Sequence, residues 1–254
     1  PVTDYFETGQ LAKLRQDDPK AGSYSILDLA RHETKLIEYR AHFALARSDI
    51  ELQSAKDPGW SFEQVLDASL SESKSKKIKL KTYSGTNYQV IAEILEKQFG
   101  SLAHLFFNEV FRPLNLEAEL MTIDRAKDQA TKLVHVHDGN QRYLGSNRIA
   151  SLRAEGAIIA RPTSNLKLLS AVFHQEFLTE QSMQIMQSKP RMIFAGIGYS
   201  MGLMHMNKLL FGKKLLGHIG ATGCLGAHQL KTNESWWVST NQFNTNSLRR
   251  VFRP

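Results

Sequence analysis

A glycine-punctuated stretch near the C-terminus decides the fold: Leu216-Gly217-His218-Ile219-Gly220-Ala221-Thr222-Gly223. Apolar residues lead into it, and a strand-like pattern resumes from Cys224 to Leu230. Glycine lets a backbone approach a ligand closely where a Cβ would block it. A strand lined in this way, with N–H groups facing a bound carbonyl, can form half of an oxyanion hole.

The strand pattern continues on both sides of this stretch. Short apolar or alternating runs, separated by Gly, Lys or Asn, cover Met192–Met206, Leu215–Ile219, Cys224–Leu230 and Trp236–Thr240. Strands this close in sequence can only be joined by hairpins, so they must be antiparallel. The sequence predicts an antiparallel sheet portion over residues 191–254, ending in the start of a C-terminal helix at 247–252.

Residues 1–190 are predicted to form a mostly helical subdomain. Helical spacing and caps mark the segments Ser25–Arg31, Trp60–Ser69, Asn87–Phe99, Leu102–Phe111, Thr163–Phe173 and Thr179–Met186. Ser25 with Asp28, Thr86 with Gln89, and Thr179 are expected to cap three of them, and Gly100 is expected to end the clearest one. Helices segregated from an antiparallel sheet imply an α+β fold.

The amino-acid composition of the chain argues against several classes of function. The 254 residues, 42% of them hydrophobic, suffice for one large core or for two subdomains that share one. The net charge of +7 raises nucleic acid as a partner, but the lysines concentrate between Lys74 and Lys81 without interleaved aromatic residues that could stack on bases. No apolar run approaches the roughly 20 residues of a membrane-spanning helix. The single cysteine, Cys224, excludes an internal disulfide framework.

A second constellation, Tyr83-Ser84-Gly85-Thr86-Asn87-Tyr88, directly precedes the clearest helix. A tyrosine on a turn at a helix start can project its hydroxyl into a cleft, although such a tyrosine is more often simply packed. His135-Val136-His137-Asp138 has the spacing of two zinc ligands, but it lacks a third and is followed by a turn signal. We interpret that segment as a surface hairpin and expect no metal and no cofactor.

The two constellations together resemble the penicillin-recognising serine hydrolases, which include class C β-lactamases, D-alanyl-D-alanine carboxypeptidases and β-lactamase-like esterases. His218 and Gly220 match the His-x-Gly box of that family, and Tyr83–Tyr88 resembles its Tyr-x-Asn box. Further landmarks follow in the family order: Ile26–His32, Ala154–Ile159 and Gly198–Leu203. The resemblance spans nearly the whole chain. It implies a β-lactamase-like fold in which an antiparallel sheet is flanked by helices and accompanied by a helical subdomain.

The resemblance also implies roles for individual residues. Tyr83 would act as a proton shuttle and would need a cationic neighbour to lower its pKa from roughly 10. His218 would shape the strand along which substrate lies, and the Ala221 N–H would help hold an oxyanion. The expected substrate contacts are Ser84, Gly85, Gly220 and Thr222. Gly85 departs from the family, because it stands where relatives carry an asparagine that binds the nucleophilic lysine and the substrate amide.

The nucleophile of the family, a Ser-x-x-Lys helix, is expected to precede residue 1. Three internal matches exist: Ser71/Lys74, Ser73/Lys76 and Ser164/Lys167. The first two lie in a highly charged segment, and Ser164 falls where relatives carry an ordinary helix cap, so all three are rejected. We therefore expect the 254-residue chain alone to hydrolyse nothing. The expected partners are a small-molecule or peptidoglycan-like peptide substrate and the missing N-terminal segment.

Two hypotheses about function follow from this resemblance. In the first, the complete protein is a serine hydrolase that acts by acyl transfer on an amide or ester. In the second, the chain is a non-catalytic binding protein that retains the cleft. The resemblance favours the periplasm or cell envelope, and a cytoplasmic location stays open.

Overall fold

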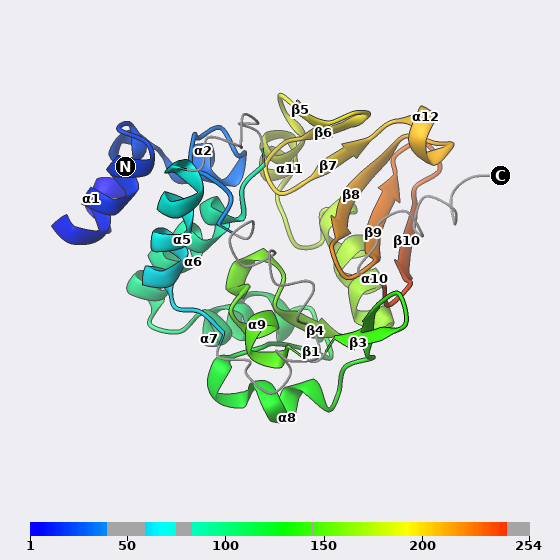
Figure 1. Cartoon of the computed structure of the whole chain (residues 1–254). Coiled ribbons are helices and arrows are strands. Elements are labelled where there is room, and N and C mark those ends of the chain that lie inside the picture. Colours follow the sequence, from blue (N-terminus) through cyan, green and yellow to red (C-terminus); the bar gives the residue numbers. More distant parts are fainter. Residues whose placement is uncertain (40–58, 75–82, 144, 243–254) are drawn as a thin grey trace. The chain divides into compact units, whose positions relative to one another are not determined.

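The computed structural model describes residues 1–39, 59–74, 83–143 and 145–242 (Figure 1). The chain forms two compact units that are discontinuous in sequence. Unit 1 comprises residues 1–105, 120–131 and 145–157, and unit 2 comprises residues 106–119, 132–144 and 158–254. The predicted helix at 247–252 and most of the lysine-rich run lie outside the described residues. The predicted subdomain boundary at residue 190 stays a prediction.

Unit 1 consists mainly of helices. Its α-helices are α1 (Thr8–Asp17), α2 (Ile26–Ala30), α5 (Phe62–Lys74), α6 (Gly85–Phe99), α7 (Leu102–Phe106, whose last residue is assigned to unit 2), α8 (Ala126–Ala130) and α9 (Ser146–Ala150). The main core lies where α6 meets α1, α2 and α5, and its fully buried side chains include Leu14, Leu29, Leu66, Val90 and Ile94. The apolar face of α6 therefore organises this unit.

Local capping explains where α2 begins. The Ser25 hydroxyl accepts a hydrogen bond from the Asp28 N–H at 3.1 Å, and the Asp28 carboxylate accepts one from the Ser25 N–H at 2.7 Å. This reciprocal capping box satisfies two N–H groups that a helix start leaves without partners. The sequence prediction for this helix start is confirmed.

The predicted capping of α6 is wrong. Its N-cap is Ser84, no side chain caps it, and Gly85 is its first residue. The Thr86 hydroxyl instead accepts from the Tyr39 N–H at 3.2 Å, and the Gln89 amide donates to the Ser151 carbonyl at 2.8 Å. Both side chains are buried and bind segments distant in sequence, which withdraws them from the helix start. The predicted helix end at Gly100, with φ of +80°, is confirmed.

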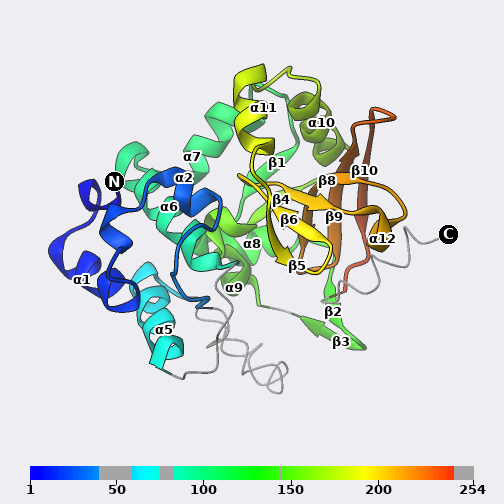
Figure 2. The same cartoon turned by 90° about the horizontal axis from the view of Figure 1, so that it is seen from above.

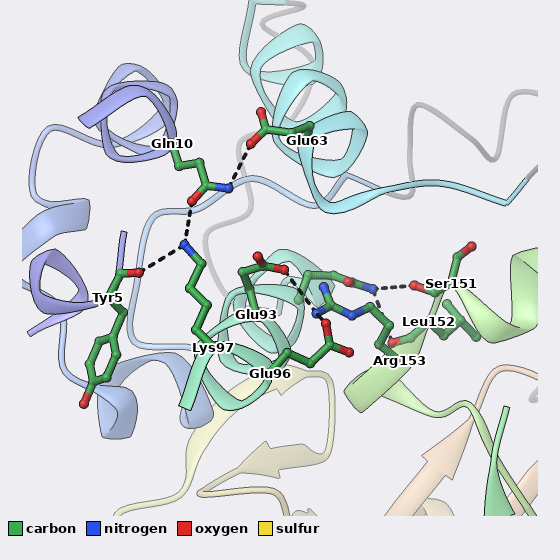
Figure 3. A network of polar contacts seen from close by, with 10 residues as sticks. Tyr5, Gln10, Glu63, Glu93, Glu96, Lys97, Ser151, Leu152 and Arg153 are labelled. Carbon is green, nitrogen blue, oxygen red and sulfur yellow. Dashed lines mark hydrogen bonds and ion pairs between the residues drawn. The ribbon is translucent and has the colours of Figure 1, made fainter. Parts of the chain in front are cut away.

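Polar side chains also join α6 to neighbouring segments of unit 1 (Figure 3). Lys97 donates to the Gln10 side chain of α1 at 2.8 Å. Arg153, in the 3-10 helix η6 (Arg153–Glu155), forms ion pairs with Glu93 at 3.1 Å and Glu96 at 2.5 Å. These contacts fix α6, whose N-terminal end carries the tyrosine box.

Unit 2 contains an antiparallel sheet of six strands in the order β10-β9-β8-β7-β6-β5 (Figure 1). The strands are β5 (Arg191–Phe194), β6 (Ile197–Tyr199), β7 (Met204–Met206), β8 (Leu215–Gly220), β9 (Cys224–Gln229) and β10 (Glu234–Ser239). Each strand pairs with the next one along the chain, so the sheet is the meander that the sequence predicts.

Helices complete unit 2. They are α10 (Pro162–Phe173), α11 (Glu180–Gln187), α12 (Lys208–Phe211) and the π-helix η4 (Phe107–Phe111). In both views, α10 lies beside the β9 and β10 end of the sheet (Figure 2), where Phe173 stacks on His228 with ring centroids 4.4 Å apart. The segment 135–138 forms a two-stranded hairpin, β2 (Val136–Asp138) with β3 (Gln141–Tyr143), as predicted.

A third, two-stranded sheet pairs β1 (Ala118–Leu120) with β4 (Ile158–Ala160). Helices in one unit and a large antiparallel sheet in the other confirm the α+β class. Among the described helices, none has the length and apolar character needed to cross a bilayer.

Candidate active site

Tyr83 and Ser84 of the tyrosine box lie directly ahead of α6 in unit 1, and residues 85–88 of the box form the first turn of that helix. Tyr83 is partly exposed, whereas Ser84 and Gly85 are buried. The Gly85 N–H donates to the Glu38 carboxylate at 2.8 Å. A carboxylate at a helix N-terminus is stabilised by the N–H groups and the positive end of the helix dipole. The first turn of α6 is thus already bound to an anionic side chain next to Tyr83.

A buried polar cluster supports the backbone of this box. The His32 Nδ1 accepts from the Ser84 N–H at 3.2 Å and lies 3.1 Å from the Asn87 side-chain nitrogen. Asn87 also donates to the Ser84 carbonyl at 3.2 Å, and its oxygen accepts from the Thr34 hydroxyl at 2.6 Å. A carbonyl can only accept, so the Asn87 atom that faces Ser84 must be its nitrogen. The His32 Nδ1 therefore accepts hydrogen bonds from both the Ser84 N–H and the Asn87 side-chain nitrogen.

The predicted histidine of unit 2, His218, lies in β8 and is partly exposed. Its Nδ1 is 2.9 Å from the Ile219 carbonyl oxygen, and its ring meets the edge of the buried Tyr199 ring at 90° with centroids 5.8 Å apart. Because the carbonyl must accept, Nδ1 carries the proton. In the neutral imidazole, Nε2 is then the hydrogen-bond acceptor.

The glycines of β8 are explained by the neighbouring strand. A Cβ on Gly217 would meet the Gly226 carbonyl oxygen, and a Cβ on Gly220 would lie 2.3 Å from the Cys224 sulfur. The sequence suggested close approach to a ligand as the reason for these glycines. Close contact between β8 and β9 is the reason that the structure gives for Gly217.

Ala221 and Thr222 occupy the turn between β8 and β9. The turn is closed by a hydrogen bond from the Gly223 N–H to the Gly220 carbonyl at 3.1 Å. Neither Ala221 nor Thr222 has positive φ, which is the pattern of a type I turn. Ala221 is exposed, and the Thr222 hydroxyl lies 3.7 Å from the Cys224 sulfur.

Two other pairs that could supply a nucleophile, Ser164 with Lys167 and Ser200 with His205, contain serines that are buried in hydrogen bonds within the fold. The Ser164 hydroxyl is buried and accepts from the Glu117 N–H at 2.9 Å, in keeping with the rejection of Ser164/Lys167 as a nucleophile pair. The Ser200 hydroxyl lies 2.8 Å from the His205 Nε2, but Ser200 is completely buried. Burial also lowers the pKa of His205. Within the described ranges, no three His, Cys, Asp or Glu side chains group as a metal site.

The predicted site residues thus fall into two groups. Unit 1 holds Tyr83, Ser84 and Gly85, and unit 2 holds His218, Gly220, Ala221 and Thr222. Sequence reasoning assigned no site role to Glu38 or His32, which contact the tyrosine box, or to Asn87 within the box, which donates to the Ser84 carbonyl. The one signal for His32 was its place in the Ile26–His32 landmark, which carried no information about its contacts.

The folds of the two units and the tyrosine and histidine boxes define a protein of the β-lactamase-like serine hydrolase class. The Beta-lactamase family model matches residues 1–251, so the chain belongs to the Beta-lactamase family. No match is found among curated protein sequences.

Several solved structures share this fold. A D-stereospecific amidohydrolase from Streptomyces sp. has a TM-score of 0.74 at 15% identity, with 99% of this chain and 76% of that chain covered. A D-amino acid amidase from Ochrobactrum anthropi SV3 has a TM-score of 0.67 at 18% identity, with 98% and 83% covered. A penicillin-binding protein from Bacillus halodurans has a TM-score of 0.62 at 13% identity, with 96% and 84% covered.

Proposed function

We propose that this chain acts as part of a serine hydrolase. That enzyme would transfer the acyl group of an amide or ester to its own serine and then to water. Membership of the Beta-lactamase family supports the reaction class. The observation that carries the proposal is the partly exposed Tyr83 on the turn ahead of α6, with the backbone of the next residue fixed by a buried cluster.

The proposed reaction assigns one task to each group. The hydroxyl oxygen of a serine in a Ser-x-x-Lys pair attacks the carbonyl carbon, and Tyr83, assisted by the lysine, takes up the hydroxyl proton. The Ala221 N–H donates to the oxyanion. Tyr83 then returns the proton to the leaving amine or alcohol as the bond to the carbonyl carbon breaks. Water then attacks the carbonyl carbon of the acyl-enzyme and gives a proton to Tyr83, which passes it to the serine oxygen as the bond from that oxygen to the carbonyl carbon breaks and the acid leaves.

The proposed substrate class rests on the names of the proteins whose solved structures share this fold. Several similar structures are of one D-amino acid amidase from Ochrobactrum anthropi SV3, and one of them is a complex with L-phenylalanine amide. We therefore propose small amides, with peptidoglycan-like peptides and esters as the next candidates. Gly85 supports a departure from β-lactam recognition, because a glycine cannot make the side-chain contacts of the usual asparagine.

The experiment begins with the open reading frame that encodes this chain. The hydrolase proposal expects a Ser-x-x-Lys pair within a few dozen residues upstream of Pro1. The product of that reading frame is then incubated with D-phenylalanine amide, a p-nitrophenyl ester and a fluorescent penicillin. Turnover of one substrate, with an acyl adduct on the upstream serine in the intact mass, supports the proposal. A reading frame that encodes the pair but yields a protein without turnover or adduct contradicts it.

A non-catalytic binding protein is the second candidate. Of the three internal Ser-x-x-Lys matches, Ser164 is buried in a structural hydrogen bond and Ser71 lies exposed on α5. This observation favours a binding role if the reading frame begins near Pro1. The two candidates are separated by measuring binding of the same amide and penicillin to the 254-residue chain, which is expected to show no hydrolysis in either case.

A further inference from the structure

His32 occupies a backbone position that side chains seldom adopt. It follows the C-cap of α2 with φ of +54°, and its N–H donates to the Leu29 carbonyl at 3.0 Å. The next residue, Glu33, donates to the Asp28 carbonyl at 2.8 Å. These two bonds form a Schellman motif, in which glycine is the usual residue at the position of His32. The chain therefore places an imidazole where a glycine would avoid backbone strain.

The imidazole contacts the tyrosine box on two sides. Its ring lies against Tyr83, with centroids 4.3 Å apart and planes tilted by 38°, and against Tyr88, with centroids 5.2 Å apart. Its Nδ1 accepts from the Ser84 N–H. His32 is only 1% exposed, so it can act on a substrate only through the residues that it touches. A glycine at this position would supply neither the ring nor the acceptor.

We infer that His32 is a positioning residue for Tyr83: its ring face sets the place of the phenol, and its Nδ1 fixes the backbone that follows. This inference rests on the proposed function, in which Tyr83 transfers protons. Proton transfer depends on placement, because a general base must lie within hydrogen-bond reach of the proton that it takes. The strained backbone at His32 is then explained by the demand for an imidazole beside Tyr83.

Two substitutions separate the two contacts. His32→Asn keeps an acceptor at the place of Nδ1 and tolerates positive φ, but it removes the ring. His32→Phe keeps a ring but removes the acceptor. The matched control is Gln175→Asn, because Gln175 has φ of +61° in an equivalent Schellman motif at the end of α10 and is exposed.

The first test uses NMR on the 254-residue chain and needs no activity. In the wild type we expect a scalar coupling across the hydrogen bond from the Ser84 N–H to the His32 Nδ1. The exchange rate of the Ser84 amide proton should rise at least tenfold in His32→Phe and stay within threefold in His32→Asn. The Tyr83 ring resonances should move in both variants and stay in place in Gln175→Asn. Absence of the coupling in the wild type, or unchanged Tyr83 resonances in a folded His32→Asn variant, overturns the inference.

The second test uses the active product of the full reading frame. Each His32 variant is expected to lower kcat at least tenfold with KM within threefold, and Gln175→Asn should change neither. Tyr83→Phe separates the two proposals. If Tyr83→Phe lowers kcat and the folded His32 variants do not, the positioning role is wrong while the proposed function stands. If Tyr83→Phe also leaves kcat unchanged, the proton-transfer role of Tyr83 is wrong, and the positioning inference falls with it.

Discussion

A Cβ on Gly217 would lie 1.9 Å from the carbonyl oxygen of Gly226 on the adjacent strand, and the φ of Gly217 is +156°. No side chain fits at that distance, and few adopt that backbone angle. Strands β8 and β9 are therefore in contact through bare backbone just before His218. The position of His218 depends on this contact.

Gly217→Ala should lower the free energy of unfolding by about 3 kcal/mol, because the strand must shift or the backbone must strain. Urea denaturation followed by fluorescence measures the change. Gly9→Ala in α1 is the control, since an added Cβ there meets nothing within 4 Å. The control should change stability by no more than about 1 kcal/mol, in the stabilising direction. Equal stability of Gly217→Ala and wild type would contradict the close strand contact.

Ala221→Pro in the product of the full reading frame tests the proposal that the Ala221 N–H is an oxyanion donor. Proline lacks the N–H and fits the second position of a type I turn, and Gly220 before it is already in a strand. We expect kcat to fall about 100-fold or more, the scale of losing one oxyanion donor. Ala221→Gly keeps the N–H and should retain kcat within about tenfold. Similar kcat values for the proline and glycine variants would show that this N–H does not hold the oxyanion.

Tyr83→Phe removes one oxygen from the tyrosine box and leaves the ring that contacts His32. In the active protein, kcat should fall about 100-fold to 10,000-fold, the usual contribution of a positioned acid or base. The matched control is Tyr88→Phe, which also contacts His32 but loses a hydroxyl bonded to the Ala30 carbonyl. This control should alter stability more than kcat. The reverse pattern would assign the proton transfer to another group.

The pH dependence of stability should carry a contribution from His228. Burial lowers the pKa of His228 from 6.5, and electrostatic repulsion from the neighbouring His174 lowers it further. The folded protein then binds fewer protons than the unfolded chain, so this residue makes stability rise with pH up to about 6.5 and fall as the solution becomes more acidic.

His228→Phe should remove this part of the pH dependence. The variant retains stacking on Phe173 but loses the hydrogen bond to Ser235. Urea unfolding at pH 5 and pH 8 should show a smaller difference between the two pH values than in the wild type. His205, whose pKa is lowered by burial, continues to contribute in the same direction, so some dependence remains. An unchanged difference would mean that His228 binds protons equally in both states.

Features that depend on neighbours in sequence could be predicted. The caps at Ser25 and Thr179 involve residues three positions apart, and both form as expected. The antiparallel meander also follows from short spacing, although the run Met192–Met206, predicted as one segment, forms the three strands β5, β6 and β7. The expected cap by Thr86 and Gln89 has the same local pattern and does not form. Its side chains bind Tyr39 and Ser151, which the local pattern cannot reveal.

In the candidate site, too, the features that depend on neighbours in sequence could be predicted and those that depend on distant contacts could not. The place of Tyr83 before a helix is a local property, and the sequence predicted it. The contact of Ser84 with His32 joins residues 52 positions apart, and it depends on the left-handed backbone of His32. The reason for Gly217 was likewise non-local, because it lies in the opposite strand. Pairing across the fold, rather than residue type, determines these features.

The turn that carries Ala221 is anchored on two sides. The Gly223 N–H closes the turn on Gly220, and the Gly223 carbonyl accepts from both the N–H and the hydroxyl of Thr240, at 2.8 and 3.1 Å. An insertion in this turn would also have to disrupt the hydrogen bonds between Gly223 and Thr240 at the end of β10. Exchanging the exposed side chain at 221 would therefore disturb the end of β10 less than lengthening the loop, so a library of variants in this turn would best begin at that position.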